Sequence, residues 1–506
     1  MQSFEVRGNT LLSPERIGAV LESFKGQRSV EELRQAAAAV QELYREAGYG
    51  AVVAYLPEQN PRDGKILISV LEGKLSSITV FGNERHSAKA VRRSLPALRE
   101  GATPRVRDLD LQVRLANENP ARRVALTLEP GTAQGQVDAR VNVTESRDSQ
   151  WWLFVDNTGD DRTGRWRSTV GWRHDNVADL DHQATVQWQT SPTDLANVRV
   201  GTVTYGLPFY AQSLRLDAYA AYSSVDGGTA ATALGNLAFS GRGGMLGVRL
   251  SRPLARVDEI DQRLAIALDR RAYRNDCSIV GLPSGACGAA GESVTTHPLT
   301  LEYSAQSSGT WPLGVYLSWS RNLDVGGSHA EARDFDEVRP GSRPDFSLWR
   351  LNAYMHPRLP REWSVRARLV GQVTSHALVP GEQFGLAGSR AVRGYEEREI
   401  VGDRGFLGSV ELVSPPLGAA DSPAAGSSQA IVQLSAFLDA GRVENHLGTE
   451  CLQGRTRCSL ASQGIGLSWA RGGTRLKLDL ARAARDGNST RRGDLRAHVA
   501  VSHAFD

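Results

Sequence analysis

The sequence predicts a mainly β protein: a sixteen-stranded transmembrane antiparallel β-barrel that follows two small α/β domains. Three observations support this prediction. The 506 residues are too many for a single core. Apolar residues follow a helical period only in about the first quarter of the chain, and beyond it apolar and polar residues alternate as in strands. No stretch approaches about 18 consecutive apolar residues, so strands would have to make any membrane crossing.

Composition excludes several other classes. The net charge is only +3, and no basic run is interleaved with aromatic residues, so no nucleic-acid partner is expected. Hydrophobic residues make up 41% of the chain, which is ordinary for a folded protein. The first residues, MQSFEVRGN, lack a basic segment followed by an apolar one. A secretory signal, if the gene encodes one, is therefore expected to have been removed.

Residues 1–74 form the first predicted domain, in the order β-α-α-β-β. A short alternating strand ends at Gly8, and Ser13 then has the features of a helix N-cap because Pro14 follows it. Ser29 and Glu32 have the spacing of a capping box at the start of a second helix, which Gly48 ends. Two strands complete the domain, at residues 51–56 and 65–71.

Residues 75–146 form the second predicted domain, which repeats this pattern. LSSITVFGN echoes FEVRGN, helices are expected over Ser87–Leu98 and Arg107–Ala116, and a strand pair follows. This order, with a strand running to Gly-Asn before the first helix, resembles the POTRA domain. The resemblance implies a periplasmic module whose exposed strand edge pairs with an extended peptide. A generic two-layer α/β spacer is the alternative.

Residues 147–506 form the predicted barrel. In Leu214–Tyr222, for example, apolar residues occupy one face and Arg215, Asp217 and Tyr219 lie on the other. A soluble sandwich would also alternate, but many segments of about ten residues with an arginine-rich face favour a barrel that holds water inside. Sixteen strands are expected to begin near Trp151, Arg165, His182, Val198, Leu214, Ala238, Gln262, Ser293, Pro312, Asp345, Ser364, Phe406, Ala430, Gln463, Thr474 and Asp494. Long outer connections are expected at Gly227–Leu237, Asp276–Glu292, His329–Arg343 and His446–Ser462, and at the segment before Phe406.

The four cysteines fall in two of these outer connections. Cys277 and Cys287 share one, and Cys451 and Cys458 share another, so each pair could form a local disulfide in an oxidising compartment. A zinc site is the alternative, but neither pair has the CxxC spacing and no histidine lies among them. We therefore expect two disulfides and no metal site.

A long charged connection, SRAVRGYEEREIVGDRGFLGSVE at Ser389–Glu411, lies between two predicted strands, and its length suggests a functional loop. It contains two motifs, VRGY and GDRG, made of Val392, Arg393, Gly394, Tyr395, Gly402, Asp403, Arg404 and Gly405. With the stretches LEPGTAQGQVDARVNV, FVDNTGDDRTG, VTYGLPF and FLDAGRV, and with two POTRA-like domains before a sixteen-stranded barrel, the chain resembles the TpsB outer-membrane transporters of two-partner secretion. Members of that family usually carry an amino-terminal plug helix, which is expected to be missing here because the sequence begins at the first POTRA-like domain.

The resemblance implies that loop 6, about residues 388–405, folds back into the barrel and that Arg393 meets an acid on the wall. Strand alternation predicts that this acid is Asp439, because Asp439 points inward together with Phe437 when Leu438 faces lipid. Gly394 and Gly441 would permit close backbone approach. The alternative is that Arg393 is one of many solvated loop arginines.

The resemblance further implies an outer-membrane translocator, with its POTRA domains in the periplasm, that secretes a large unfolded TpsA exoprotein such as an adhesin, haemolysin or contact-dependent toxin. A barrel-insertion factor of the BamA type and a passive porin are the alternatives. No enzyme activity, catalytic residue or cofactor is expected, because HExxH and GxSxG motifs and a usable dinucleotide glycine pattern are absent from the sequence. The expected partners are the exoprotein and outer-membrane lipid, and a monomer is expected.

Overall fold

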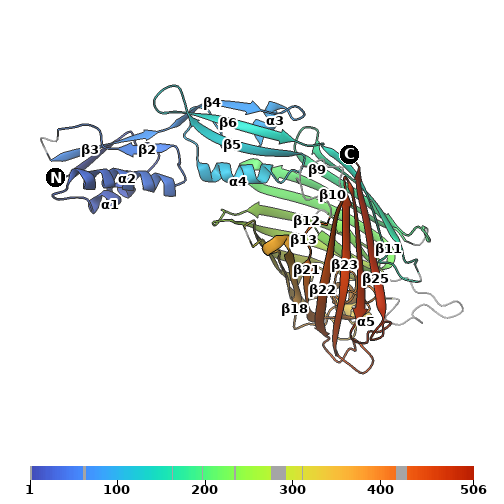
Figure 1. The fold of residues 1–506 in the computed structure, drawn as a ribbon. Coiled ribbons are helices and arrows are strands. Elements are labelled where there is room, and N and C mark those ends of the chain that lie inside the picture. The colour runs from blue at the N-terminus through green and yellow to red at the C-terminus, as the bar shows by residue number, and fades with distance from the viewer. Residues whose placement is uncertain are drawn as a thin grey trace. The chain divides into compact units, whose positions relative to one another are not determined.

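The computed structural model describes residues 3–60, 64–161, 163–195, 198–232, 235–274, 292–309, 311–417 and 430–505 (Figure 1). The chain divides into two compact units. The first contains residues 1–147, 178–181 and 208–214, and the second contains residues 148–177, 182–207 and 215–506.

The first unit begins with a three-stranded sheet covered by two helices. The sheet has the order β1-β3-β2, in which β1 is parallel to β3 and β2 is antiparallel to it. Ser13 and Ser29 cap the two helices as predicted, the second through a capping box with Glu32. The elements are β1 (Ser3–Arg7), α1 (Pro14–Glu22), α2 (Val30–Glu46), β2 (Val52–Tyr55) and β3 (Lys65–Glu72).

The second module repeats this plan with the sheet order β4-β6-β5. Its first helix, α3, ends at Arg93 rather than at the expected Leu98, because Pro96 disfavours helical backbone at the residue before it. The elements are β4 (Lys74–Phe81), α3 (Ala88–Arg93), α4 (Val106–Ala116), β5 (Arg122–Pro130) and β6 (Gln136–Glu145). Asp181 and Tyr210 also belong to this unit. They form a buried cluster with Arg122, whose Nη2 lies 2.7 Å from Asp181 Oδ2.

Equivalent glutamates hold the turn before the first helix of each module. Glu72 accepts hydrogen bonds from the backbone N–H groups of Thr10 and Leu11, at 2.8 and 3.0 Å, and from the Tyr44 hydroxyl at 2.9 Å. Glu145 likewise accepts three backbone N–H bonds in the second module, from residues 84–86. The repeated Gly-Asn signal in the sequence thus marks a repeated carboxylate-capped turn.

Acid is expected to loosen the first of these turns. Burial alone would raise the pKa of Glu72, but the hydrogen bonds from Thr10, Tyr44 and Leu11 outweigh it and hold the pKa below its ordinary value of 4.5. A lowered folded-state pKa contributes stability above the unfolded value, and this is lost as the pH falls through the folded value. Hydrogen exchange corrected for intrinsic rates should therefore show that Thr10 and Leu11 lose protection below about pH 4.5.

The variant Glu72→Gln provides the control for this prediction. It should lower the protection of both amides at neutral pH and make that protection independent of acid. The amides of the turn held by Glu145 should keep their protection and its acid dependence. Unchanged acid dependence in Glu72→Gln would contradict the assignment to this carboxyl group.

The second unit is a closed antiparallel barrel, in which the last strand, β25, pairs with the first, β7. Strands β14 and β15 both pair with β13 and together make one crossing, so the described residues form sixteen crossings, as predicted. The strands are β7 (Ser149–Asp156), β8 (Arg167–Val177), β9 (His182–Thr190), β10 (Val200–Phe209), β11 (Leu214–Thr232), β12 (Gly235–Pro253), β13 (Ile260–Arg274), β14 (Val294–Thr296), β15 (Pro298–Ser307), β16 (Leu313–Asn322), β17 (Ser347–Met355), β18 (Ser364–Val373), β21 (Arg404–Val413), β22 (Ile431–Glu444), β23 (Arg457–Arg471), β24 (Thr474–Ala483) and β25 (Leu495–Phe505).

Alternation along these strands separates an apolar outer face from a polar inner one. Val410 and Leu438 are 54% and 64% exposed on the outside, whereas their neighbours Glu411 and Asp439 are buried inside. Among the described residues, no helix is long and apolar enough to cross a membrane.

Three outer connections differ from the sequence prediction. Strands β11 and β12 extend through most of the expected loop Gly227–Leu237, because their backbone pairing continues beyond the apolar pattern through residues rich in glycine and threonine. Strand β23 begins at Arg457 rather than near Gln463, which shortens the loop after β22. The connection His329–Arg343 contains a helix, α5 (Ala332–Val338). Most of the expected loop Asp276–Glu292 lies outside the described residues.

Candidate functional site

The segment between β18 and β21, here called the lid loop (residues 374–403), is folded and largely buried. Two short strands within it, β19 (Phe384–Gly385) and β20 (Val401–Gly402), pair with each other. Its apolar side chains form a core with inward residues of the barrel wall: Leu386, Val392, Tyr395 and Ile400 are each at most 1% exposed. The segment that carries the sequence motifs is therefore packed against the wall and not extended into solvent.

Arg393 contacts the predicted wall residue, Asp439 of β22. Its Nε lies 2.7 Å from Asp439 Oδ2, its Nη2 lies 2.9 Å from Oδ1, and its backbone N–H donates to Oδ2 at 3.1 Å. The pair is bidentate and buried, at 5% and 2% exposure. Such charge-assisted bonds are short and directional, and only a guanidinium offers this fork.

Two further carboxylates surround Arg393. Its Nη1 lies 3.4 Å from Glu411 Oε2 on β21 and 3.2 Å from Asp479 Oδ2 on β24. The guanidinium carbon also lies 3.3 Å from the centre of the Phe437 ring, a cation–π contact. Glu411 and Asp479 were not predicted as partners of Arg393, although both are acids at inward positions of alternating strands.

Two other cations partly balance this cluster, which joins three strands of the wall. Lys477 Nζ lies 2.9 Å from Asp479, and Arg366 Nη1 lies 3.8 Å from Glu411. Three carboxylates therefore face three cations, but only Arg393 comes from the lid loop. Removing it would leave three acids close together with two cations at their edge.

The residues after Arg393 fit closely against the wall. Gly394 has a φ of +91°, which favours glycine, and its N–H donates to His498 Nε2 at 2.9 Å. The Tyr395 hydroxyl lies 2.8 Å from the Ala461 carbonyl oxygen. At Gly441 a Cβ atom would lie only 2.5 Å from Leu386 Cδ1, so this wall position needs glycine. Gly394 and Gly441 therefore lie where the lid loop and the wall approach each other closely.

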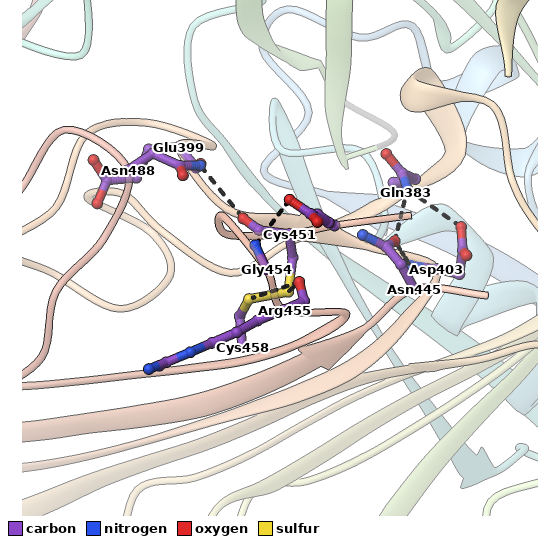
Figure 2. The surroundings of a disulfide bond; sticks show 10 residues. Gln383, Glu399, Asp403, Asn445, Cys451, Gly454, Arg455, Cys458 and Asn488 are labelled. Atoms are coloured by element: carbon purple, nitrogen blue, oxygen red, sulfur yellow. Dashed lines mark hydrogen bonds between the residues drawn. A yellow bond between two sulfur atoms is a disulfide. The ribbon is translucent and has the colours of Figure 1, made fainter. Parts of the chain in front are cut away.

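Asp403, from the second motif, forms a separate buried contact near the outer end of the lid loop. It makes a bidentate ion pair with Arg339 from the connection that carries α5, with Arg339 Nη2 at 2.7 Å from Asp403 Oδ2. It also accepts the N–H groups of Leu378, at 3.0 Å, and His446, at 2.8 Å, and its own N–H donates to Asn445 Oδ1 at 3.1 Å. Gln383, Asp403 and Asn445 lie together in Figure 2. One carboxylate therefore ties together three connections of the barrel.

The other residues of the second motif lie at the wall. A Cβ atom at Gly402 would lie 2.6 Å from Val443 Cβ, and one at Gly405 would lie 2.6 Å from the Arg442 carbonyl oxygen, so both glycines permit close approach. Arg404 differs from its neighbours, because it begins β21 and its side chain is exposed beside Glu444, at 2.8 Å. Arg404 therefore takes no part in the buried contacts of the lid loop.

One of the two expected disulfides is present. Cys451 and Cys458 are bonded and buried, in the same apolar cluster as Tyr395 and Ile400 of the lid loop (Figure 2). The Asn488 side-chain amide donates to the backbone carbonyls of Glu399 and Cys451, which links the disulfide hairpin to the lid loop. Cys277 and Cys287 lie outside the described residues.

A cavity of about 390 Å³ lies beside the lid loop and is lined by three arginines, Arg271, Arg350 and Arg398. Glu382 contacts Arg271 at 3.0 Å and Arg350 at 3.2 Å. Asp269 contacts Arg271 at 2.6 Å, so these two acids offset part of the arginine charge. The described residues contain no cluster of three histidine, cysteine or acidic side chains arranged to hold a metal ion. The lumen is therefore a charged, arginine-rich space bounded by the lid loop.

Comparison with known proteins finds consistent similarities. Residues 135–469 match the family model of haemolysin secretion/activation protein ShlB/FhaC/HecB, and residues 1–73 match the ShlB-type POTRA domain. The outer membrane transporter CdiB of Dickeya dadantii (strain 3937) is 24% identical over 439 residues, which is 83% of this chain and 71% of that protein. The heme/hemopexin transporter protein HuxB of Haemophilus influenzae (strain ATCC 51907 / DSM 11121 / KW20 / Rd) is 22% identical over 472 residues, 91% of this chain and 78% of that protein.

A solved structure shares the fold. CdiB from Escherichia coli superposes with a TM-score of 0.79 at 19% sequence identity, and the match covers 100% of this chain and 90% of that one. At this identity the likeness concerns the fold, and it agrees with the barrel and the two sheet-and-helix modules described above.

Proposed function

Since the chain belongs to the haemolysin secretion/activation protein family ShlB/FhaC/HecB, a family of outer-membrane translocators that secrete TpsA-type exoproteins, we propose how its parts carry out this export. The large exoprotein is unfolded when it docks on the POTRA domains, and it passes through the barrel after the lid loop moves. The observation that carries this proposal is the buried contact of Arg393 with three wall carboxylates, because it provides a closed state that a client must open.

The contacts of the lid loop support its role as a gate. A buried ion pair that loses one partner costs about 3 to 5 kcal/mol, which is enough to keep a loop closed at rest. Arg271, Arg350 and Arg398 line the cavity beside the loop and offer charged groups that an extended client segment can contact when the loop moves. Energy for export comes from folding of the client outside the cell, which prevents its return.

The first module offers an edge for docking. β2 is an edge strand of its sheet, and a groove of about 500 Å³ lies between β2 and α2. Gln41 of α2 faces this edge, and its Oε1 accepts the N–H of Ala54 at 3.2 Å. The Ala54 N–H therefore points away from β3, toward the open edge of the sheet. A strand of the client added at this edge could accept a hydrogen bond from it.

The proposal also assigns the domain boundaries, the location of each domain and the oligomeric state. We divide the chain into POTRA domains at residues 1–74 and 75–146, which lie in the periplasm, and a barrel at residues 147–506. The lid function belongs to about residues 388–405, which include the second half of the lid loop and the first two residues of β21. Outer-membrane lipid surrounds the apolar outer face of the barrel, and the transporter acts as a monomer.

Photocrosslinking tests the docking step. A photoreactive phenylalanine analogue at Tyr55, which is 41% exposed at the β2 edge, should form an adduct with the exoprotein that the transporter secretes. The same analogue at Val30, which is 62% exposed at the start of α2, is the matched control and should not. Equal crosslinking at both positions would reject docking at this edge.

Export itself is tested in a strain that lacks residues 1–146 of the chain. The barrel should still assemble, as shown by heat-modifiable migration, but the exoprotein should not reach the medium. Continued secretion would overturn the docking step. Depletion of many outer-membrane proteins when the whole gene is deleted would instead favour an insertion factor.

A further inference from the structure

An apolar groove crosses the outer face of the barrel on strands β16, β17, β18, β21 and β22, and its volume is about 720 Å³. Five large side chains form its lining and are exposed by 37 to 62%: Leu317, Trp349, Leu369, Val373 and Phe406. Strands β18 and β21 lie side by side (Figure 1). The groove is therefore a hollow in a wall of otherwise projecting side chains.

Gly371 forms part of the floor of this groove. It lies on the outward side of β18, between Leu369 and Val373. All the remaining outward residues of β18 carry a side chain. A Cβ atom at Gly371 would meet nothing closer than 3.6 Å, and its φ is not in the left-handed region. The backbone therefore tolerates a side chain here, and the glycine leaves open a space that a larger residue would fill.

Arginines lie at one end of the groove. Arg404 begins β21 and Arg442 lies near the end of β22, so both are at the barrel end opposite to the one where β7 starts. Arg457 of β23 is next to them, and Glu444 pairs with Arg404 at 2.8 Å and with Arg457 at 2.9 Å. Three cations face one carboxylate, so the cluster has a net charge of about +2.

The outward arginines of other strands show the same preference for this end of the barrel. Arg270, Arg321 and Arg482 occupy outward positions there, and at the opposite end the outward strand positions carry Arg252 and Arg471. In the proposed orientation the richer end meets the outer leaflet. Guanidinium groups beside an apolar groove suit a ligand with an acyl chain and a phosphate group.

We propose that this groove binds a glycolipid of the outer leaflet whose headgroup carries phosphate, with an acyl chain over Gly371 and the phosphate at Arg404 and Arg442. The inference rests on the proposed function for the placement of this end of the barrel at the outer leaflet. It adds a lipid site that is distinct from the lid loop. The site lies at the start of β21, the strand that follows the lid loop.

Lipid binding by the purified full chain in nonionic detergent tests this site. Native mass spectrometry with bisphosphorylated lipid A should show binding, and the double variant Arg404→Gln/Arg442→Gln should raise the dissociation constant by about tenfold or more, since charge-assisted bonds are lost. Arg252→Gln, an outward arginine at the other end, is the control and should bind as the wild type does. Equal binding by all three proteins would overturn the proposal.

A second variant tests the acyl part of the site without changing charge. Gly371→Leu should weaken lipid A binding because its side chain fills the groove, and the unstrained backbone should keep the barrel folded. Dephosphorylated lipid A should bind more weakly than lipid A to the wild type. Equal binding of the two lipids would overturn the phosphate assignment. Because binding is measured apart from secretion, a chain that binds lipid A but exports nothing would reject the proposed function and leave this site standing.

Discussion

Replacing Arg393 by alanine is expected to abolish or strongly reduce secretion and to raise the ion conductance of the barrel in planar lipid bilayers. The substitution removes the lid-loop cation and leaves Asp439, Glu411 and Asp479 buried close together. Breaking a buried pair in this way costs about 3 to 5 kcal/mol, far more than thermal energy. The closed position of the lid loop should therefore be lost.

The design separates loss of the gate from loss of the barrel. Arg492→Ala, in the exposed connection between β24 and β25, removes an equal charge and should leave both conductance and secretion unchanged. Arg393→Lys keeps the charge but cannot form the fork to Asp439, so we expect an intermediate effect. Heat-modifiable migration should be normal in all three variants. Normal secretion and conductance in Arg393→Ala would reject the gate.

Strand alternation predicted the barrel because one physical period governs almost every crossing. The outer face of the barrel is apolar and the inner face is polar. Segments such as Leu214–Tyr222 can therefore be recognised as strands from the alternation in their sequence. The extension of β11 to Thr232 carries no such signal, because the sequence of residues 226–232, DGGTAAT, does not alternate apolar and polar residues as the barrel strands do. The prediction therefore failed where the strands lose their two-sided pattern, and the helix α5 was missed within a segment interpreted as a loop.

The partner of Arg393 was predictable for the same reason. Asp439 is an inward acid in a well-patterned strand, and the resemblance supplied the loop that meets it. Glu411 and Asp479 satisfy the same inward rule, but choosing among inward acids on different strands requires the barrel register, which alternation does not provide. Arg339 lies in an irregular connection, and no local pattern links it to Asp403.

Replacing Asp403 by asparagine is expected to loosen the outer part of the lid loop while the contact of Arg393 stays in place. The change removes the carboxylate that pairs with Arg339, which is only 5% exposed. It also weakens the bonds that Leu378 and His446 donate to Asp403. The local cost should again be about 3 to 5 kcal/mol. Hydrogen exchange should show lost protection at residues 378–383 and 445–446, with less change around Arg393.

A matched surface pair provides the control for this second contact. Asp345 pairs with Arg343 at 3.1 Å beside the same connection, but both side chains are well exposed, so Asp345→Asn should change protection little. The double variant Arg339→Gln/Asp403→Asn should be less damaged than Asp403→Asn alone, because it removes the unpaired charge. If protection near Arg393 falls as much as it does at residues 378–383, the lid loop opens as one unit. Two separate attachments would then be the wrong description, and opening would need both ion pairs to break together.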